Sequence, residues 1–455
     1  MKKLVVKITL GLVCVALICG SVAYIIIGKT PGELLDYADV RLQGHPKLEW
    51  IAAPIFSVVR QITEQPKLEE RLAKTFNVPS LPPLLVDMSL VEALPKASPD
   101  VLRVGPGQQY LSIAEAARTA KDGQVIEILA GNYYGDVALW SQRKLTIRGI
   151  GGRARLYANN KSAEGKAIWV FRNGDFIVEN IEFIDAKVSD DNGAGIRAET
   201  GSLVVRNCLF YGNQNGILTS DKLTLLEVLG SEFAYSGAGD GQSHGIYVGP
   251  IAEFRALGNY FHHSNRGHLI KSRAEKNTIA YNRLTDETNG RASYEIDLPN
   301  AGRAFVGFNL IQQSATGENS TLISFGAEGL RWQQNELWLE KNTLVNDNPW
   351  GGTFLRVAKG VSNVTAINNL MVGYGGYQIG ATSTVIDNID AQWQWFILPQ
   401  RLNYHLKSTI SPVTTNYVRP EWSPEPGYYI DVTQYKLDPA ASKFAGALPV
   451  QQVEQ

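Results

Sequence analysis

Three strand-like stretches decide the fold of this chain: SHGIYVGP (residues 243–250), FHHSNRGHLIKSRAEKN (261–277) and NGRASYEIDLPNAG (289–302). Their apolar anchors, Ile246, Ile270 and Ile296, lie 24 and 26 residues apart. A spacing of this size is typical of one coil of a solenoid. The same segment, residues 242–302, holds four of the six histidines, so the repeat and the chemistry-bearing side chains coincide.

Similar stretches continue on both sides of this segment. They surround Ile196, Ile217, Ile323, Leu355 and Ile379, at spacings of 21 to 32 residues. Each is followed by a second β-rich run with an asparagine at its bend: Asn207, Asn259, Asn282, Asn309, Asn342 and Asn369. Short β-branched strands with Asn/Gly turns and no helical period predict a right-handed parallel β-helix, an all-β fold. A leucine-rich repeat would require a leucine consensus that this chain lacks.

The chain divides into four predicted regions. Residues 101–390 form the right-handed parallel β-helix, whose first coil is capped by a helix near Ser112 to Ala120. Residues 31–100 combine a short helical stalk with a proline-rich stretch, read as a semi-rigid linker or as an extended arm along the solenoid. Residues 391–455 form a C-terminal cap or tail that packs along the coils.

Residues 1–30 are predicted to be an N-terminal membrane anchor. Lysines precede an uncharged run from Ile8 to Gly28, which as a transmembrane helix would be about 31 Å long, enough to span a bilayer. The lysines favour a cytoplasmic N-terminus and an exported remainder. The expected location is a bacterial inner membrane with the β-helix in the periplasm. A cleaved signal ending at Ser21-Val22-Ala23 is the alternative, and the protein would then be secreted.

Composition excludes some classes of function. The formal net charge is -1 with 19% charged residues. The chain therefore lacks the excess of basic residues that would indicate a nucleic-acid partner. Of the three cysteines, Cys14 and Cys19 fall in the predicted anchor. Cys208 is therefore expected to be a buried, inert thiol rather than part of a disulfide or thiolate metal site.

Strand alternation assigns side chains to the two faces of each strand. If the isoleucines point inward, the residues next to them in each strand point outward and form a row along successive coils. Residues in the turns before these strands lie on the same outward side. The candidate catalytic residues are Lys271, Arg273, His244, Tyr247 and His268. The candidate substrate-binding residues are Arg197, His263, Arg291, Glu295 and Asp297.

Two interpretations of this row remain open. In one, Lys271 and Arg273 pair with Glu295 and Asp297 and stabilise the stack by at most about 1 kcal/mol per pair. In the other, the row is a groove for a uronic-acid-containing polysaccharide. Lyase chemistry on such a polymer needs a cation for the substrate carboxylate, a base for the C5 proton and an acid for the leaving oxygen.

The repeat pattern of residues 101–390 resembles the pectate-lyase-like right-handed β-helix superfamily. Within it, Lys271-Ser272, followed by Asn277-Thr278-Ile279 and Asn282, resembles the Lys-Ser motif coil of the lyases that include chondroitinase B and the β-helical alginate lyases. The resemblance implies that Lys271 is the Brønsted base. From the residues alone, a histidine or Tyr247 is the alternative base, with Lys271 neutralising the carboxylate.

The chain departs from that family at two places. The coil on which the family carries a catalytic arginine has Glu295 to Asp297 here, with Arg291 and Arg303 on either side. The Asn-Gly-x-Glu motif that helps bind calcium is replaced by residues 244–247, which read His-Gly-Ile-Tyr. No cofactor is therefore expected, although the resemblance would imply calcium.

The sequence thus predicts a membrane-anchored, exported β-helix that acts on an acidic polysaccharide, as a β-eliminating lyase. A non-catalytic glycan-binding protein of an exopolysaccharide system is the first alternative. A glycoside hydrolase is the second, because Glu295 and Asp297 lie about 6.6 to 7 Å apart along one strand, within the range for paired carboxylates.

Overall fold

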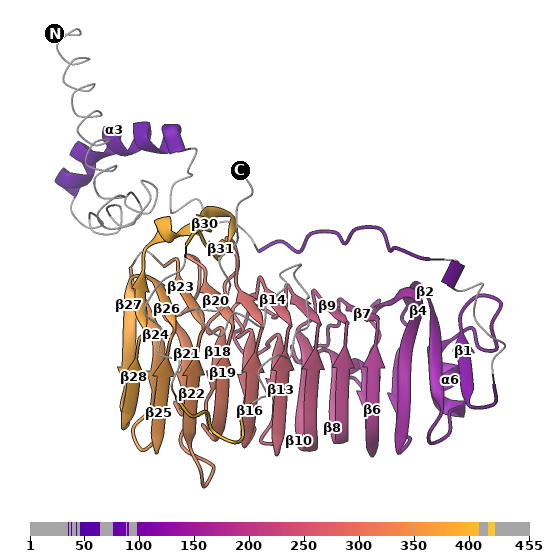
Figure 1. Ribbon diagram of the computed structural model, residues 1–455. Coiled ribbons are helices and arrows are strands. Elements are labelled where there is room, and N and C mark those ends of the chain that lie inside the picture. Colours follow the sequence, from indigo (N-terminus) through magenta and orange to yellow (C-terminus); the bar gives the residue numbers. More distant parts are fainter. Residues whose placement is uncertain are drawn as a thin grey trace.

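A computed structural model describes residues 35, 38, 42, 46–63, 76–87, 89–90, 98–348, 350–408 and 417–423. Its main body is a parallel β-helix of about ten coils, which confirms the predicted solenoid (Figure 1). The strands β1 to β29 form one continuous hydrogen-bonded network. Successive coils place these strands on three long faces, which we call the first, second and third sheets.

The first sheet carries the predicted isoleucine stack. Its strands are β3 (Ala138–Trp140), β5 (Ala167–Phe171), the first halves of β8 (Ala194–Arg206) and β10 (Asn215–Leu229), β12 (Ile246–Val248), β15 (Ile270–Ser272), β18 (Ile296–Leu298), β21 (Thr321–Phe325), β24 (Gly352–Val357) and β27 (Gly375–Ile379). Parallel pairing aligns Ile196, Ile217, Ile246, Ile270, Ile296 and Ile323, all fully buried. The predicted inward stack is confirmed.

The last coil differs from the prediction. Leu355 pairs with Tyr377, whereas Ile379 pairs with Val357. An aromatic side chain occupies the stack position there, and a search for aliphatic anchors at a fixed period does not detect it.

The other two sheets complete each coil. The second sheet contains β1 (Val101–Val104), β2 (Val125–Tyr134), β4 (Lys144–Tyr157), β6 (Gly174–Glu179), the second halves of β8 and β10, β13 (Glu253–Leu257), β16 (Lys276–Ala280), β19 (Arg303–Gly307), β22 (Glu336–Glu340), β25 (Asn363–Ile367) and β28 (Ser383–Ile386). The third sheet contains the last parts of β2 and β4, then β7 (Ile181–Ile184), β9 (Leu209–Tyr211), β11 (Glu232–Ala234), β14 (Tyr260–His262), β17 (Arg283–Thr285), β20 (Leu310–Gln313), β23 (Thr343–Asn346), β26 (Leu370–Gly373) and β29 (Ile389–Ala391). Phe183, Phe210, Phe233 and Phe261 stack inside it with ring centroids 4.6 to 5.0 Å apart.

A ladder of buried asparagines links the bends between the second and third sheets. The side-chain amide of each member donates to the side-chain oxygen of the next, through Asn259, Asn282, Asn309, Asn342, Asn369 and Asn388. Asn207, which was predicted to mark an equivalent bend, is not in the ladder. Cys208 occupies that position, and its backbone N–H donates to Ser231 Oγ. Burial raises the pKa of the Cys208 thiol to about 12, so it is inert as predicted.

The first coil is closed by the predicted helix. Helix α6 (Ile113–Thr119) has Ser112 as its N-cap, and the Asp136 carboxylate accepts hydrogen bonds from the backbone N–H groups of Ile113 and Ala114. Ile113, Ala116 and Ala117 are buried in the core of the solenoid. The helix therefore shields the edge of the coil stack from water.

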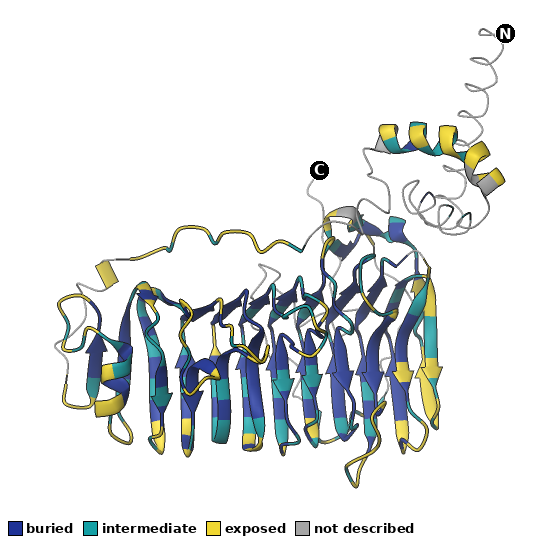
Figure 2. Ribbon diagram, turned by 180° about the vertical axis from the view of Figure 1, so that it is seen from behind, coloured by how far each residue is buried: buried dark blue, intermediate teal, exposed yellow. Residues whose placement is uncertain are grey.

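The proline-rich stretch forms an extended arm along the third sheet (Figure 1). The arm, residues 76–87, accepts hydrogen bonds from Tyr211 Oη at the Pro79 carbonyl and from Arg155 Nη1 at the Pro82 carbonyl. One of the two predicted interpretations of this stretch, an arm on the solenoid, is therefore correct. Most residues of the arm are exposed to solvent (Figure 2).

Helix α3 (Pro46–Thr63) lies within the stretch predicted as a stalk. The predicted anchor, Ile8 to Gly28, lies outside the described residues. Among the helices that the structure does describe, none is long and apolar enough to cross a membrane.

The chain after β29 packs along the side of the solenoid. It forms η1 (Trp393–Trp395), β30 (Phe396–Leu398), η2 (Pro399–Arg401) and β31 (Asn403–Leu406). Trp393, Phe396 and Tyr404 pack on Leu310 and Val345 of the third sheet. Residues 417–423 cross the second sheet, where Arg419 forms an ion pair with the fully buried Glu340.

Candidate functional site

An outward row runs along the first sheet, on the face opposite the isoleucine stack. Parallel pairing places Arg197, Leu218, Tyr247, Lys271, Asp297, Ser324 and Arg356 at equivalent positions of successive coils. Adjacent members are about 4.8 Å apart at the backbone. The predicted outward positions of Arg197, Tyr247, Lys271 and Asp297 are thus correct.

Glu295 does not belong to this row, and its predicted position was wrong. It precedes β18, in a register position shared with the core residues Leu269 and Leu322. Its side chain is fully buried, and within the described residues neither carboxyl oxygen has a hydrogen-bond partner. Burial, with a smaller contribution from Asp286, raises the pKa of Glu295 well above its usual value. The strict alternation that predicted an outward side chain fails because Glu295 lies in the turn before the strand.

Lys271 and Arg273 form the centre of a group of polar side chains. The Lys271 Nζ atom lies 3.0 Å from Glu328 Oε1 and 3.6 Å from Asp297 Oδ2. Arg273 donates from Nη2 to Glu328 Oε2 at 2.6 Å and from Nε to the hydroxyl of Tyr247 at 3.0 Å. These contacts bring side chains from four neighbouring coils together at one place. The predicted ion pair between Lys271 and Asp297 is present, whereas Glu328 takes the place predicted for Glu295.

Glu328 was not predicted from the sequence. It lies in the connection between β21 and β22, 57 residues after Lys271. Connections between strands have variable length and no period, so a repeat pattern gives no signal for the residues they contribute. Asn300, which accepts from Arg273 Nη1 at 2.6 Å, was missed for the same reason.

His244 and His268 join the group as buried, neutral rings. Their ring centroids are 4.5 Å apart, and the backbone N–H of His268 donates to His244 Nδ1. Burial, followed by Lys271 and Arg273, lowers the pKa of His244 to about 3. Burial and His244 lower the pKa of His268 well below its usual value. Because so low a pKa makes an imidazole a weak base, neither ring suits the general-base role that was considered for them.

Asp297 carries a carboxyl group whose pKa lies near neutral. Burial raises the pKa of its carboxyl to about 6, against the opposing effect of Lys271. Its Oδ2 atom is 3.6 Å from both Lys271 Nζ and His268 Nε2. A carboxyl with this pKa can exchange a proton near neutral pH, as general acid–base chemistry requires.

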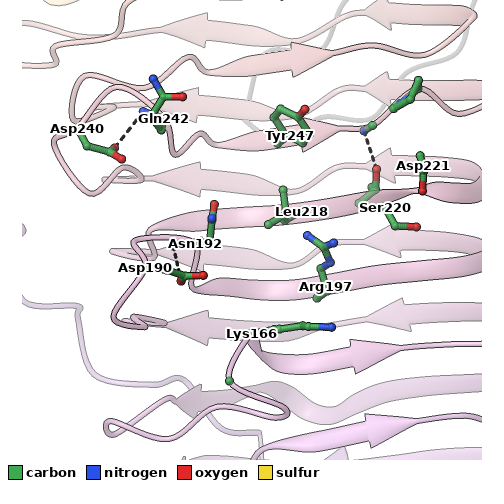
Figure 3. Close-up of a pocket in the computed structure, with 14 residues that line it drawn as sticks. Lys166, Asp190, Asn192, Arg197, Leu218, Ser220, Asp221, Asp240, Gln242 and Tyr247 are labelled. Carbon is green, nitrogen blue, oxygen red and sulfur yellow. Dashed lines mark hydrogen bonds between the residues drawn. The ribbon is translucent and has the colours of Figure 1, made fainter.

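A pocket of about 800 Å³ adjoins the group on its N-terminal side (Figure 3). Tyr247 and Arg197 lie on its floor, and Lys166 lies beside Arg197. Asp240 and Gln242, with Asp190 and Asn192, line one side of it. Burial lowers the pKa of the Arg197 guanidinium from its usual value, although arginine remains charged at physiological pH. Arg197, Leu218 and Tyr247 belong both to this pocket and to the outward row, and we call the pocket together with the adjoining row the groove.

Two predicted site residues lie elsewhere. His263 is placed just after β14, where its ring stacks on Tyr235 at 4.7 Å and its Nδ1 is 2.6 Å from His262 Nδ1. It belongs to the third-sheet side of the coil rather than to the group around Lys271. Arg291 lies in the connection between β17 and β18, and its backbone N–H donates to the Ser264 carbonyl.

The residues at the position of the family's calcium motif do not fit that ion. Calcium takes oxygen ligands, mainly carboxylates and carbonyls. His244 and Tyr247 have their rings 5.8 Å apart, and the cations Lys271 and Arg273 lie beside them. Within the described residues there is no group of three or more His, Cys, Asp or Glu side chains that could hold a metal.

The buried His244 should make the protein sensitive to acid. Because its pKa is lower in the folded chain than the unfolded value of about 6.5, the unfolded chain takes up the proton first. Stability is therefore expected to fall as the pH drops from about 6.5 towards 3, by about 1.4 kcal/mol per pH unit from this residue. Denaturant unfolding at several pH values would measure the slope.

The control for this prediction is His244→Asn, which keeps an acceptor near the backbone N–H of His268 but does not titrate in this range. The variant should lose stability less steeply than the parent between pH 6 and pH 4. Equal slopes in the two proteins would contradict the prediction.

Comparison with known proteins finds similarity to solved structures. No family model matches the sequence, and no curated protein matches it either. The chain is similar to a solved structure described as the crystal structure of pectate lyase Pel9A, with 11% sequence identity and a TM-score of 0.43. The similarity covers 80% of this chain and 98% of that one.

Proposed function

We propose that this protein binds an acidic polysaccharide along the outward face of the first sheet and cleaves it by β-elimination. One observation carries the proposal: Lys271 Nζ and Arg273 Nη2 converge on the two oxygens of one carboxylate, that of Glu328. A site that holds a protein carboxylate in this way has the charge and spacing to hold the carboxylate of a uronic acid.

The surrounding side chains can supply the rest of the chemistry. Lys271 and Arg273 would neutralise the substrate carboxylate, which makes the proton on C5 easier to remove. Asp297, whose pKa of about 6 leaves it ionised at neutral pH, would accept that proton. The electrons of the C5–H bond then form the C4–C5 double bond as the C4–O bond breaks. Tyr247 would donate its proton to the leaving oxygen, because Arg273 occupies an acceptor site of the hydroxyl and leaves the O–H free to donate.

This assignment differs from the one implied by the Lys-Ser motif. In the lyases that the coil of Lys271 resembles, the motif lysine is the base. Here Lys271 is ion-paired with two carboxylates, so charge neutralisation is the role that we assign to it. The proposed class of reaction, β-elimination on a uronic acid, is the same in both assignments.

Binding without cleavage is the second candidate function. It is favoured by the burial of Asp297, whose side chain is 4% exposed. A hydrolase based on Glu295 and Asp297 is not supported, because the Glu295 carboxyl is enclosed in the core and does not reach the groove. We also propose that the β-helix is held at a bacterial inner membrane, facing the periplasm, since the sequence before residue 31 favours an anchor.

A panel of uronic-acid polymers, treated with the purified protein, tests the proposal. New ultraviolet absorbance would indicate unsaturated sugar ends and therefore a lyase. New reducing ends without absorbance would indicate a hydrolase, and retention of the polymer without cleavage would indicate a binding protein. If no uronic-acid polymer is bound or cleaved, the proposed function is wrong.

A further inference from the structure

The carboxylate of Glu328 covers the two cations from the solvent side. The side chains of Lys271 and Arg273 are 13% and 20% exposed, whereas that of Glu328 is 46% exposed. Its two oxygens are divided between the two cations, one oxygen to each. A carboxylate arriving from the groove would therefore meet Glu328 before it met either cation.

The side chain of Glu328 can leave without rearranging the backbone around it. Its backbone N–H donates to the Pro299 carbonyl, and the Gly329 N–H donates to the Gly326 carbonyl. The Asn300 amide also donates to the Gly329 carbonyl. These bonds fix the turn, while the side chain extends from an exposed position. Rotation of the side chain then breaks only its two ion pairs, with Lys271 and with Arg273, and both are weak because Glu328 is partly exposed.

The cations would keep their places after Glu328 left. Asp297 remains near Lys271, and Arg273 keeps its bonds to Asn300 and to the hydroxyl of Tyr247. With Glu328 in place, two cations face two carboxylates. Without it, one positive charge is uncompensated, so an anion is drawn to the position that the Glu328 carboxylate has left.

We propose that Glu328 occupies the subsite for the substrate carboxylate, and that an acidic glycan binds by displacing it. This inference rests on the proposed function, because it assigns the position at which the uronic acid would bind. It also makes Glu328 a built-in competitor that weakens the binding of short or sparsely charged glycans. A chain with many carboxylates displaces it more readily, since other uronic acids can bind along the row at the same time.

The test compares the parent with Glu328→Gln in calorimetric titrations with a uronic-acid oligomer and with neutral dextran. Removing two ion pairs of up to about 1 kcal/mol each should tighten oligomer binding by up to about thirtyfold. The matched control is Glu253→Gln, which removes a carboxylate that is ion-paired with Arg255 on the second sheet and is 30% exposed. The control should bind like the parent, and dextran binding should not change in any of them.

A second measurement follows Lys271 directly. Acetylation of Lys271 by an amine-reactive ester, read by mass spectrometry, should be faster in Glu328→Gln and slowed again by added uronic-acid oligomer.

The outcomes separate this inference from the proposed function. Tighter oligomer binding by Glu328→Gln, or binding that is measurable in the variant alone, supports the inference. If the parent binds the oligomer and the variant binds it equally or more weakly, Glu328 is a structural ion pair and the inference is wrong while the function stands. If neither protein binds the oligomer and Lys271 is not protected, the function is wrong and the inference falls with it.

Discussion

Ile270→Asp is expected to destabilise the solenoid by several kcal/mol, the largest effect of any substitution considered for this protein. Ile270 is fully buried between Ile246 and Ile296 in the inward stack. An aspartate there would be enclosed by apolar side chains with no cation to pair with. It would have to be protonated or exposed, and either requirement costs free energy. Thermal or denaturant unfolding of the purified domain measures the loss.

Arg356→Asp is the matched control for this substitution. Arg356 lies on the same sheet but on the outward row, where it is exposed. A new carboxylate at that position should change the free energy of unfolding by well under 1 kcal/mol. If Ile270→Asp melts like Arg356→Asp, the inward and outward faces have been exchanged, and the whole candidate site would have to be reassigned.

Lys271→Ala should reduce the affinity for a uronic-acid polymer, and any cleavage of it, by orders of magnitude, with little change in stability. The substitution removes one of the two cations that hold a carboxylate at the site. The loss of stability is small because the partner Glu328 is partly exposed and can be solvated, and because the buried Asp297, whose pKa is already about 6, can take up a proton. Binding by calorimetry and the melting temperature, measured on the same samples, separate the two effects.

A purely structural ion-pair row predicts the opposite result for the same variant. Binding and activity would then be unchanged, the stability loss would be at most about 1 kcal/mol, and Glu328→Gln in the same chain would partly restore it. Lys276→Ala, which removes an exposed lysine from the second sheet, is the control for a general loss of positive charge. Full binding by Lys271→Ala would rule out the proposed site.

The sequence predicts the coils and the outward row well because both depend on spacing along the chain. A stack of coils needs one inward apolar residue in each coil, and here such residues recur every 21 to 32 positions. The residue after each of them points outward. Lys271, Asp297, Tyr247 and Arg197 were found in this way. The helix near Ser112 was predicted from its amphipathic pattern, and the prolines gave the arm along the solenoid as one of two interpretations; both signals are also local.

The remaining features of the site depend on contacts that have no regular spacing. Glu328 reaches Lys271 from a connection two coils away, and nothing in its own neighbourhood marks it. Glu295 was misplaced because the outward rule was extended one residue beyond the strand, into a turn where side chains follow other directions. His244 and His268 were found at the site, but their burial, and with it their low pKa values, depends on the packing of three coils. These are properties of tertiary structure rather than of sequence period.

The C-terminal tail has a mechanical consequence for the solenoid. A stack of coils in which each touches its neighbours can fray from an open end, one coil at a time. Here residues 417–423 turn back from that end: Tyr417 and Arg419 bind Glu340 of β22, and Trp422 packs against the cluster of Leu257, Ala280 and Phe305 on β13, β16 and β19. The coil of β22 should not separate from the coils of β13 to β19 while these contacts hold, since Glu340 would be left buried without its cation. The coils from β13 to β22 should therefore open together, as one cooperative unit, when the chain is pulled or heated.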